Sequence, residues 1–433
     1  MEMNNRMTEI EQRSVCDGVN FRSVRDIKFK TVRMSVNFLL PLQKKAAASN
    51  AILPFLLSRA SREYPDFTKL GERLAELYGA DLSADVQKIG DVQMLSLYAS
   101  GIADRYALQG ESTSTELSKL LCSVLFDPPF EDGLFPKEGF EQEQRQTIEL
   151  IDSEFNDKRT YARQRCEEIM CKNEPYGISR YGSKEDIRNL KREELTGVWR
   201  YLIQNARIEI MVLGDCDPKP VYEGFYNAFQ KLGKRSTVEC PTVNVKKADQ
   251  VNEVTEKMDI AQSKLVLGFR TAASLRDEQV EAVKLMVALF GGTPNSKLFL
   301  NVREKLSLCY YCSALYVSMK GIMLVQSGVE TKNIEKAKEE ILFQLEEIKK
   351  GNFDDNEVNA AKLSMCNSYR SLSDSLGGLE AWYLSQTFAN YVKRPEEAAA
   401  LISAVTRQQM IDAANNVTLD TVYRLVGNEV EKE

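Results

Sequence analysis

The stretch VRMSVNFLLPL, residues 32–42, decides the fold class of this 433-residue chain. Every second side chain at its start is apolar, and these side chains share one face: Val32, Met34, Val36, Phe38 and Leu40. A period of two is typical of a strand that buries one face. After two helical stretches, strands at about 82–88 and 92–100 are joined by the turn pair Gly90-Asp91. The first half is thus expected to form an antiparallel sheet packed on helices.

The second half of the chain repeats this order of elements. KLVLGF at 264–269 alternates, a hairpin joins 309–317 to 322–329, and long helical patterns lead to a last strand near 421–428. Glycines near the strand ends match between the halves: Gly101 with Gly328, and Gly214 with Gly427. Hairpins and helices occur in any α+β protein, but matching order and spacing favour a duplication.

We therefore predict an α+β fold of two tandem homologous domains, each an antiparallel sheet packed on long helices. The boundary falls in the polar stretch 232–250, which places the domains at residues 1–235 and 236–433. A chain of 433 residues is long enough for two or three domains at about 150 residues each.

The composition excludes several function classes. The chain has no histidine, which rules out Ser-His-Asp and Cys-His catalysis and imidazole-ligated metals. The net charge of −6 argues against a nucleic-acid partner. Nine cysteines read as reduced thiols, the first 14 residues lack the apolar core of a secretory signal, and no apolar stretch reaches the length of a membrane span. These features predict a cytoplasmic protein without a membrane partner.

Cysteines and carboxylates give weak indications of a metal site. Cys309 and Cys312 lie three apart on a predicted strand, where alternation would point them to opposite faces. Cys166 and Cys171 are expected to be buried thiols. The carboxylate-rich helix at 138–155 is interpreted mainly as a solvated face, with a carboxylate-only metal site as the alternative. No metal ion or other cofactor is therefore predicted for this chain.

The segment NSKLFLNVREKLSLCYY, residues 295–311, carries the strongest functional signal. A helix in it ends near Arg303, and the following strand carries Tyr310. A guanidinium can bind a peptide carbonyl or carboxylate, and a phenol can donate a hydrogen bond to a developing oxyanion. From these residues alone, a structural arginine and a core tyrosine remain the alternative.

Three segments together resemble the insulinase/pitrilysin zinc metallopeptidases, a family with an inverted zinc motif. The family's arginine-tyrosine signature matches Asn-Ser-Lys-Leu-Phe at 295–299 and the seven-residue step from Arg303 to Tyr310. PYGISRYGSKEDIRNLKREEL at 175–195 resembles the family's Pro-Tyr-Gly segment, and IEIMVLGDCDP at 208–218 resembles a family strand. The resemblance spans most of the chain, and its duplicated α+β halves fit the predicted fold.

The chain departs from the family at two places. Active members carry His-x-x-Glu-His on the first helix after the first long strand, here residues 50–62. The family pattern puts Pro54 and Ser58 at the histidine positions and Leu57 at the glutamate position, and these side chains cannot bind zinc or activate its water. In the arginine-tyrosine segment, Ser307 and Cys309 replace the family's usual glycine and alanine.

The resemblance implies a non-catalytic bacterial subunit that pairs with a separate His-x-x-Glu-His subunit. In the family, two such halves form a clamshell that encloses unfolded peptides, and zinc is expected only in the partner. Arg303 and Tyr310 are then expected to bind peptide and support the transition state in the partner's active site. A stand-alone peptide-binding or scaffolding protein, homodimeric in isolation, is the first alternative. An unrelated histidine-free enzyme is the second.

Overall fold

The computed structural model describes residues 10–427. Residues 1–9 of the N-terminal stretch, and the last residue of the strand predicted at 421–428, lie outside this range. The described chain divides into two units, one made of residues 10–151 and 178–241 and the other of 152–177 and 242–427. Among these residues, no helix is both long and apolar enough to cross a lipid bilayer.

The first unit is built on a six-stranded sheet in the order β1-β2-β6-β3-β5-β4. Its strands are β1 (Ile10–Cys16), β2 (Val19–Arg25), β3 (Thr31–Pro41), β4 (Asp81–Ile89), β5 (Val92–Ile102) and β6 (Arg207–Gly214). All neighbours are antiparallel except β2 and β6. The alternating face of β3 is buried as predicted, and Val32, Met34 and Val36 lie in the core.

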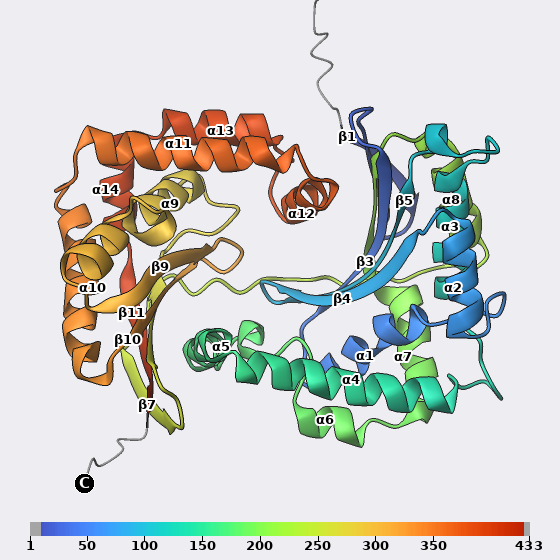
Figure 1. Ribbon diagram of the computed structural model, residues 1–433, viewed down its shortest axis with the longest axis horizontal. Helices are drawn as coiled ribbons and strands as arrows, with labels where there is room; N and C mark the ends of the chain where they lie inside the picture. Colours follow the sequence, from blue (N-terminus) through green and yellow to red (C-terminus); the bar gives the residue numbers. More distant parts are fainter. Residues whose placement is uncertain (1–9, 428–433) are drawn as a thin grey trace, which may run out of the picture. The chain divides into compact units, whose positions relative to one another are not determined.

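Helices of the first unit cover the core face of this sheet, as α3 and α8 do in Figure 1. The helices are α1 (Ala47–Leu57), α2 (Phe67–Glu76), α3 (Thr113–Phe126), α4 (Lys137–Asn156), α6 (Lys184–Asn189), α7 (Arg192–Asn205) and α8 (Pro218–Gln230), with a short 3₁₀ turn η1 (Asp104–Tyr106). The last residues of α4 already belong to the second unit.

The second unit is built on a five-stranded sheet in the order β7-β11-β8-β10-β9. Its strands are β7 (Asn252–Met258), β8 (Ser263–Arg270), β9 (Cys309–Val317), β10 (Ile322–Val329) and β11 (Thr418–Gly427). Its helical elements are α5 (Lys158–Met170), η2 (Pro175–Gly177), α9 (Val280–Val287), η3 (Ala288–Gly292), η4 (Leu298–Lys305), η5 (Thr331–Asn333), α10 (Ile334–Lys349), α11 (Asp355–Leu372), α12 (Leu376–Gln386), α13 (Pro395–Ala404) and α14 (Arg407–Asn415).

The two sheets repeat one topology. In the first, β2 runs parallel to β6, and β3, β5 and β4 follow as antiparallel neighbours. In the second, β7 runs parallel to β11, and β8, β10 and β9 follow in the same way. The predicted α+β class with two duplicated halves is confirmed, with one parallel strand pair in each sheet that the hairpin pattern does not predict.

The segment 152–177 packs with the second unit, whereas the predicted boundary at 235/236 assigns it to the N-terminal domain. Helix α5 lies against β8, β10 and β11 (Figure 1). Its apolar side chains cover the face of that sheet opposite to the main core. Cys166 and Cys171 are both fully buried there, as predicted.

A buried charge cluster joins this segment to the second sheet. The guanidinium of Arg270 lies 2.8 Å from carboxylate oxygens of both Glu174 and Asp420, and Nζ of Lys320 lies 2.8 Å from Glu174. Burial raises the pKa of Glu174, but hydrogen bonds from Lys320 and Arg270 outweigh this effect, so its pKa lies below the usual value. Because removing one member would leave a buried charge unpaired, the cluster fixes where the segment packs.

Candidate functional site: a filled zinc-motif helix and an exposed arginine-tyrosine pocket

Helix α1 carries the three positions at which active family members have zinc ligands and a general base. Pro54 lies inside the helix and is buried. The side chain of Leu57 is in the core of the first unit, with 1 % of the residue exposed. Ser58 follows the helix, and its hydroxyl donates a 2.9 Å hydrogen bond to the carbonyl of Phe55. These side chains serve packing and local hydrogen bonding, and their chemistry does not fit a zinc ion.

Arg59, the next residue, forms an ion pair that the sequence reading missed. Its Nη1 lies 2.6 Å from a carboxylate oxygen of Glu143 on α4, and its Nη2 donates a 2.8 Å hydrogen bond to Gln142. Glu143 is therefore buried, although the sequence predicts that most side chains of this helix face solvent. A guanidinium thus connects the end of α1 to α4. Within residues 10–427, no group of three Cys, Asp or Glu side chains is arranged to hold a metal ion.

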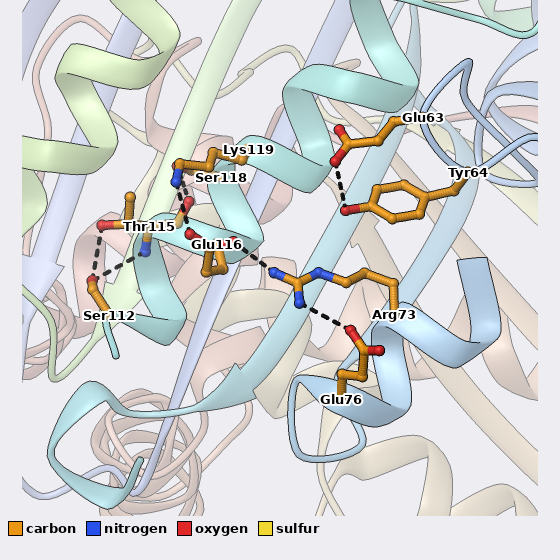
Figure 2. A network of polar contacts seen from close by, with 9 residues as sticks. All are labelled: Glu63, Tyr64, Arg73, Glu76, Ser112, Thr115, Glu116, Ser118 and Lys119. Carbon is orange, nitrogen blue, oxygen red and sulfur yellow. Dashed lines mark hydrogen bonds and ion pairs between the residues drawn. The ribbon is translucent and has the colours of Figure 1, made fainter. Parts of the chain in front are cut away.

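A cavity of about 700 Å³ lies beside the end of α1. Its walls include Arg59, the aromatic rings of Phe67 and Phe130, and the loop before α4. Figure 2 shows how α2, which forms one wall, is attached to its neighbours: Arg73 lies 3.1 Å from Glu76 on the same helix and 2.6 Å from Glu116 on α3. Charged residues make up much of its lining, whereas small-molecule sites are mostly apolar.

The arginine-tyrosine segment forms η4 and the start of β9. The chain leaves η3 at Gly292 and re-enters a helical turn at η4. Eight residues of η4 have the wide π-helical winding, which occurs often at functional sites. No side chain caps the start of η4.

Arg303 and Tyr310 line one pocket of about 420 Å³ in the second unit. The guanidinium of Arg303 lies over the ring of Phe299, at 4.7 Å from its centre, and its Nε is 3.6 Å from the carboxylate of Glu304. The Arg303 side chain is 42 % exposed, and Tyr310 is 64 % exposed. Tyr310 is therefore not a core residue, and neither residue has the burial expected of a structural role.

The backbone between Arg303 and Tyr310 contains one of the departures from the family pattern, a serine at the position of the family's usual glycine. Ser307 has φ = 51°, in the left-handed region that glycine adopts without strain. The family's usual residue at this position is the glycine that such a turn favours. This chain makes the turn with serine, at some cost in backbone strain, three residues before Tyr310.

A β-bulge at the start of β9 corrects the expectation for Cys309 and Cys312. Cys309 pairs with Val329 and Tyr311 with Gly328, so Tyr310 is an extra residue without a partner on β10. The extra residue shifts the alternation of side chains by one. Cys309 and Cys312 therefore both lie in the core of the second unit, on one face instead of two.

Comparisons with known proteins match this architecture. A model of the peptidase M16 inactive domain matches residues 189–365. The chain is 31 % identical over 419 residues to the probable inactive metalloprotease YmfF of Bacillus subtilis, covering 97 % of this chain and 98 % of that protein. It is also 22 % identical over 197 residues to the uncharacterized zinc protease YmxG of the same organism, covering 45 % and 46 %.

Solved structures agree over the whole chain. A conserved protein from Enterococcus faecalis V583 has 29 % identity and a TM-score of 0.88, covering 97 % of this chain and 99 % of its own. A peptidase M16 inactive domain from Pseudomonas fluorescens has the same fold at 15 % identity, with a TM-score of 0.78 and coverage of 98 % and 100 %. The chain therefore belongs to the peptidase M16 (insulinase/pitrilysin) family, as an inactive metalloprotease-like member.

Proposed function

We propose that this chain is the non-catalytic subunit of a heterodimeric M16 zinc peptidase and that it donates Arg303 and Tyr310 to the active site of its partner. The observation that carries the proposal is the pocket of η4 and β9, in which both side chains are exposed and share one surface. By contrast, the motif positions of α1 hold only Pro54, Leu57 and Ser58. The partner would therefore supply zinc and the general base.

The two donors suit a supporting role in peptide hydrolysis. The partner's zinc would supply an activated water, and hydrolysis of a peptide bond would develop negative charge on the carbonyl oxygen. A guanidinium and a phenol placed near that oxygen stabilise the charge without acting as acid or base. Arg303 can also bind a backbone carbonyl or carboxylate of an unfolded peptide before the reaction. The chain would thus contribute to binding and turnover while lacking hydrolytic activity of its own.

We place this assembly in the cytoplasm. All nine cysteines are free thiols, the state expected in a reducing compartment.

The test is to co-express the tagged chain with an M16 protein that carries His-x-x-Glu-His and to measure assembly and peptide cleavage. We expect a heterodimer by size, with cleavage that requires both chains and is removed by a chelator. The matched control replaces the partner's motif glutamate, which should preserve the heterodimer and abolish cleavage. Self-association alone, with peptide binding but no cooperation with the partner, would contradict the proposal and support the scaffolding alternative.

A further inference from the structure

A row of three residues crosses the second sheet on the face that α5 covers. Tyr311 on β9 pairs with Gly328 on β10, and Gly328 pairs with Lys264 on β8. A Cβ atom at position 328 would lie 2.5 Å from Cε1 of Tyr311, so the ring can lie over this strand only because residue 328 is glycine. Gly328, which matches Gly101 of the first half, thus provides the room for the ring.

Two cations meet at this ring. The guanidinium carbon of Arg159, in the first turn of α5, lies 4.3 Å from the centre of the Tyr311 ring, and Nζ of Lys264 lies 5.8 Å from it. Among the residues that the structure describes, neither cation forms an ion pair with a carboxylate. Nη2 of Arg159 donates a 3.4 Å hydrogen bond to Oγ of Ser313. Nζ of Lys264 donates one to Gln262. Both cations therefore keep N–H donors for a further acceptor.

The positive charge of Arg159 acts unfavourably on Lys264. Burial lowers the pKa of Lys264, the carboxylate of Asp157 raises it, and the charge of Arg159 lowers it again. Burial raises the pKa of Tyr311 to about 12, so its hydroxyl adds no negative charge. Asp157 is already an acceptor for the N–H of Arg159 and the hydroxyl of Thr160. Two like charges are thus held at one ring with a single carboxylate nearby, an arrangement that a bound anion would stabilise.

We propose that Arg159 and Lys264 form a binding site for a carboxylate group of a peptide, with the ring of Tyr311 as the surface that holds the two cations. Together with Asp157 they leave one net positive charge, which suits a singly charged carboxylate better than a doubly charged phosphate. A guanidinium binds a carboxylate through two parallel N–H donors, and an ammonium adds a compact charge. Arg159 is exposed and Lys264 is half-buried, so an unfolded chain can reach both.

The choice of a peptide as the ligand rests on the proposed function. Tyr311 directly follows Tyr310 on β9, and the proposed function places a peptide at Tyr310. The carboxylate is then either the C-terminus of that peptide or one of its acidic side chains.

The site lies within the second unit, so the purified full chain is tested without a partner. One short unfolded peptide with rhodamine at its N-terminus is made in three versions. The first has a free C-terminal carboxylate, the second has a C-terminal amide, and the third has the amide and one internal glutamate. Fluorescence anisotropy at constant low ionic strength measures the Kd of each version.

We expect a carboxylate to lower the Kd about 10-fold relative to the amide version without glutamate, because hydrogen bonds between charged groups are stronger than neutral ones. Tighter binding of the first version assigns the site to the C-terminus, and tighter binding of the third assigns it to an acidic side chain. Equal Kd values for the three versions, or no binding of any of them, would overturn the proposal. The cleavage test of the heterodimer is a separate measurement, so failure here leaves the proposed function standing.

Substitutions separate this site from general charge attraction. Arg159→Gln and Lys264→Gln should each reduce the preference for a carboxylate at least ~3-fold, and Lys264→Arg should retain most of it. Lys158→Gln is the matched control, because it removes the same charge one residue from Arg159, where Nζ of Lys158 lies 3.6 Å from the centre of the Phe155 ring. It should leave the preference near wild type. Thermal unfolding checks that each variant is folded. An equal loss of preference in Lys158→Gln and Arg159→Gln would overturn the assignment to these two residues.

Discussion

The end of helix α1 and the segment from Arg303 to Tyr310 differ in how their side chains are used. At the end of α1, Leu57 is packed in the core and Arg59 is held by Glu143. In the second segment, Tyr310 is extra in its strand and 64 % exposed. An exposed aromatic ring at a strand bulge contributes little to folding, so burial does not explain the tyrosine at this family position. At the motif positions of α1, by contrast, residues that pack or form local hydrogen bonds stand in place of the family's zinc ligands and general base.

The largest effect on stability is expected for Leu57→Glu, which restores the motif's general base in α1. The carboxylate would enter a fully buried apolar site without a partner, at a cost of about 4 kcal/mol or more. Thermal or urea unfolding measures this loss. Leu57→Met is the matched control and should cost less than about 1.5 kcal/mol. If Leu57→Glu were as stable as wild type, position 57 would still accommodate a carboxylate such as the motif's general base, which would contradict this account of α1. The triple change Pro54→His, Leu57→Glu and Ser58→His should therefore also fail to give an efficient peptidase.

Arg59→Ala is expected to have the next largest effect. Glu143 would remain in its buried site without a cation, which should lower the free energy of unfolding by about 3 kcal/mol. Arg62→Ala is the matched control. Arg62 pairs with Asp127, and the two side chains are 73 % and 50 % exposed, so this ion pair should contribute less than about 1 kcal/mol to stability. Adding Glu143→Gln to Arg59→Ala should recover part of the loss. Equal effects of Arg59→Ala and Arg62→Ala would show that the pair does not fasten α1 to α4.

Ser307→Gly is expected to have a small effect of opposite sign. Glycine removes the strain of φ = 51° but loses more conformational entropy on folding, so the net gain should be about 0.5–1 kcal/mol. The midpoint of urea unfolding measures the change. Ser313→Gly, within regular β9, is the control and should destabilise the chain. Destabilisation by Ser307→Gly would contradict the left-handed conformation of this turn.

The sequence was sufficient to predict the features that depend on local periodicity. Alternation in residues 32–42 predicted β3, and the repeated order of strands predicted two duplicated sheets. The resemblance of residues 295–311 predicted that Arg303 and Tyr310 belong together, and the structure places both at one pocket. These features need only side-chain period or motif spacing, which the chain displays directly.

Features that depend on one extra residue or on distant partners were not predictable in the same way. The bulge at Tyr310 reverses the facing of Cys312, and alternation alone assumes that strands are regular. Glu143 reads as one of many carboxylates on α4, because its partner Arg59 is 84 residues away in sequence. The segment 152–177 lies before the predicted boundary, and its place in the second unit is set by tertiary contacts, among them the charge cluster of Glu174.

The smallest effect on stability is expected for Tyr310→Phe, and its effect on catalysis tests the central claim most directly. The hydroxyl is removed from an exposed ring, so stability and heterodimer size should be unchanged within about 0.5 kcal/mol. Turnover per heterodimer should fall roughly 100- to 1,000-fold, the usual cost of losing one oxyanion donor. Tyr311→Phe, on the neighbouring residue outside the pocket, should leave turnover near wild type. Equal turnover for wild type, Tyr310→Phe and Tyr311→Phe would contradict the account and leave the Tyr310 hydroxyl no direct part in the chemistry.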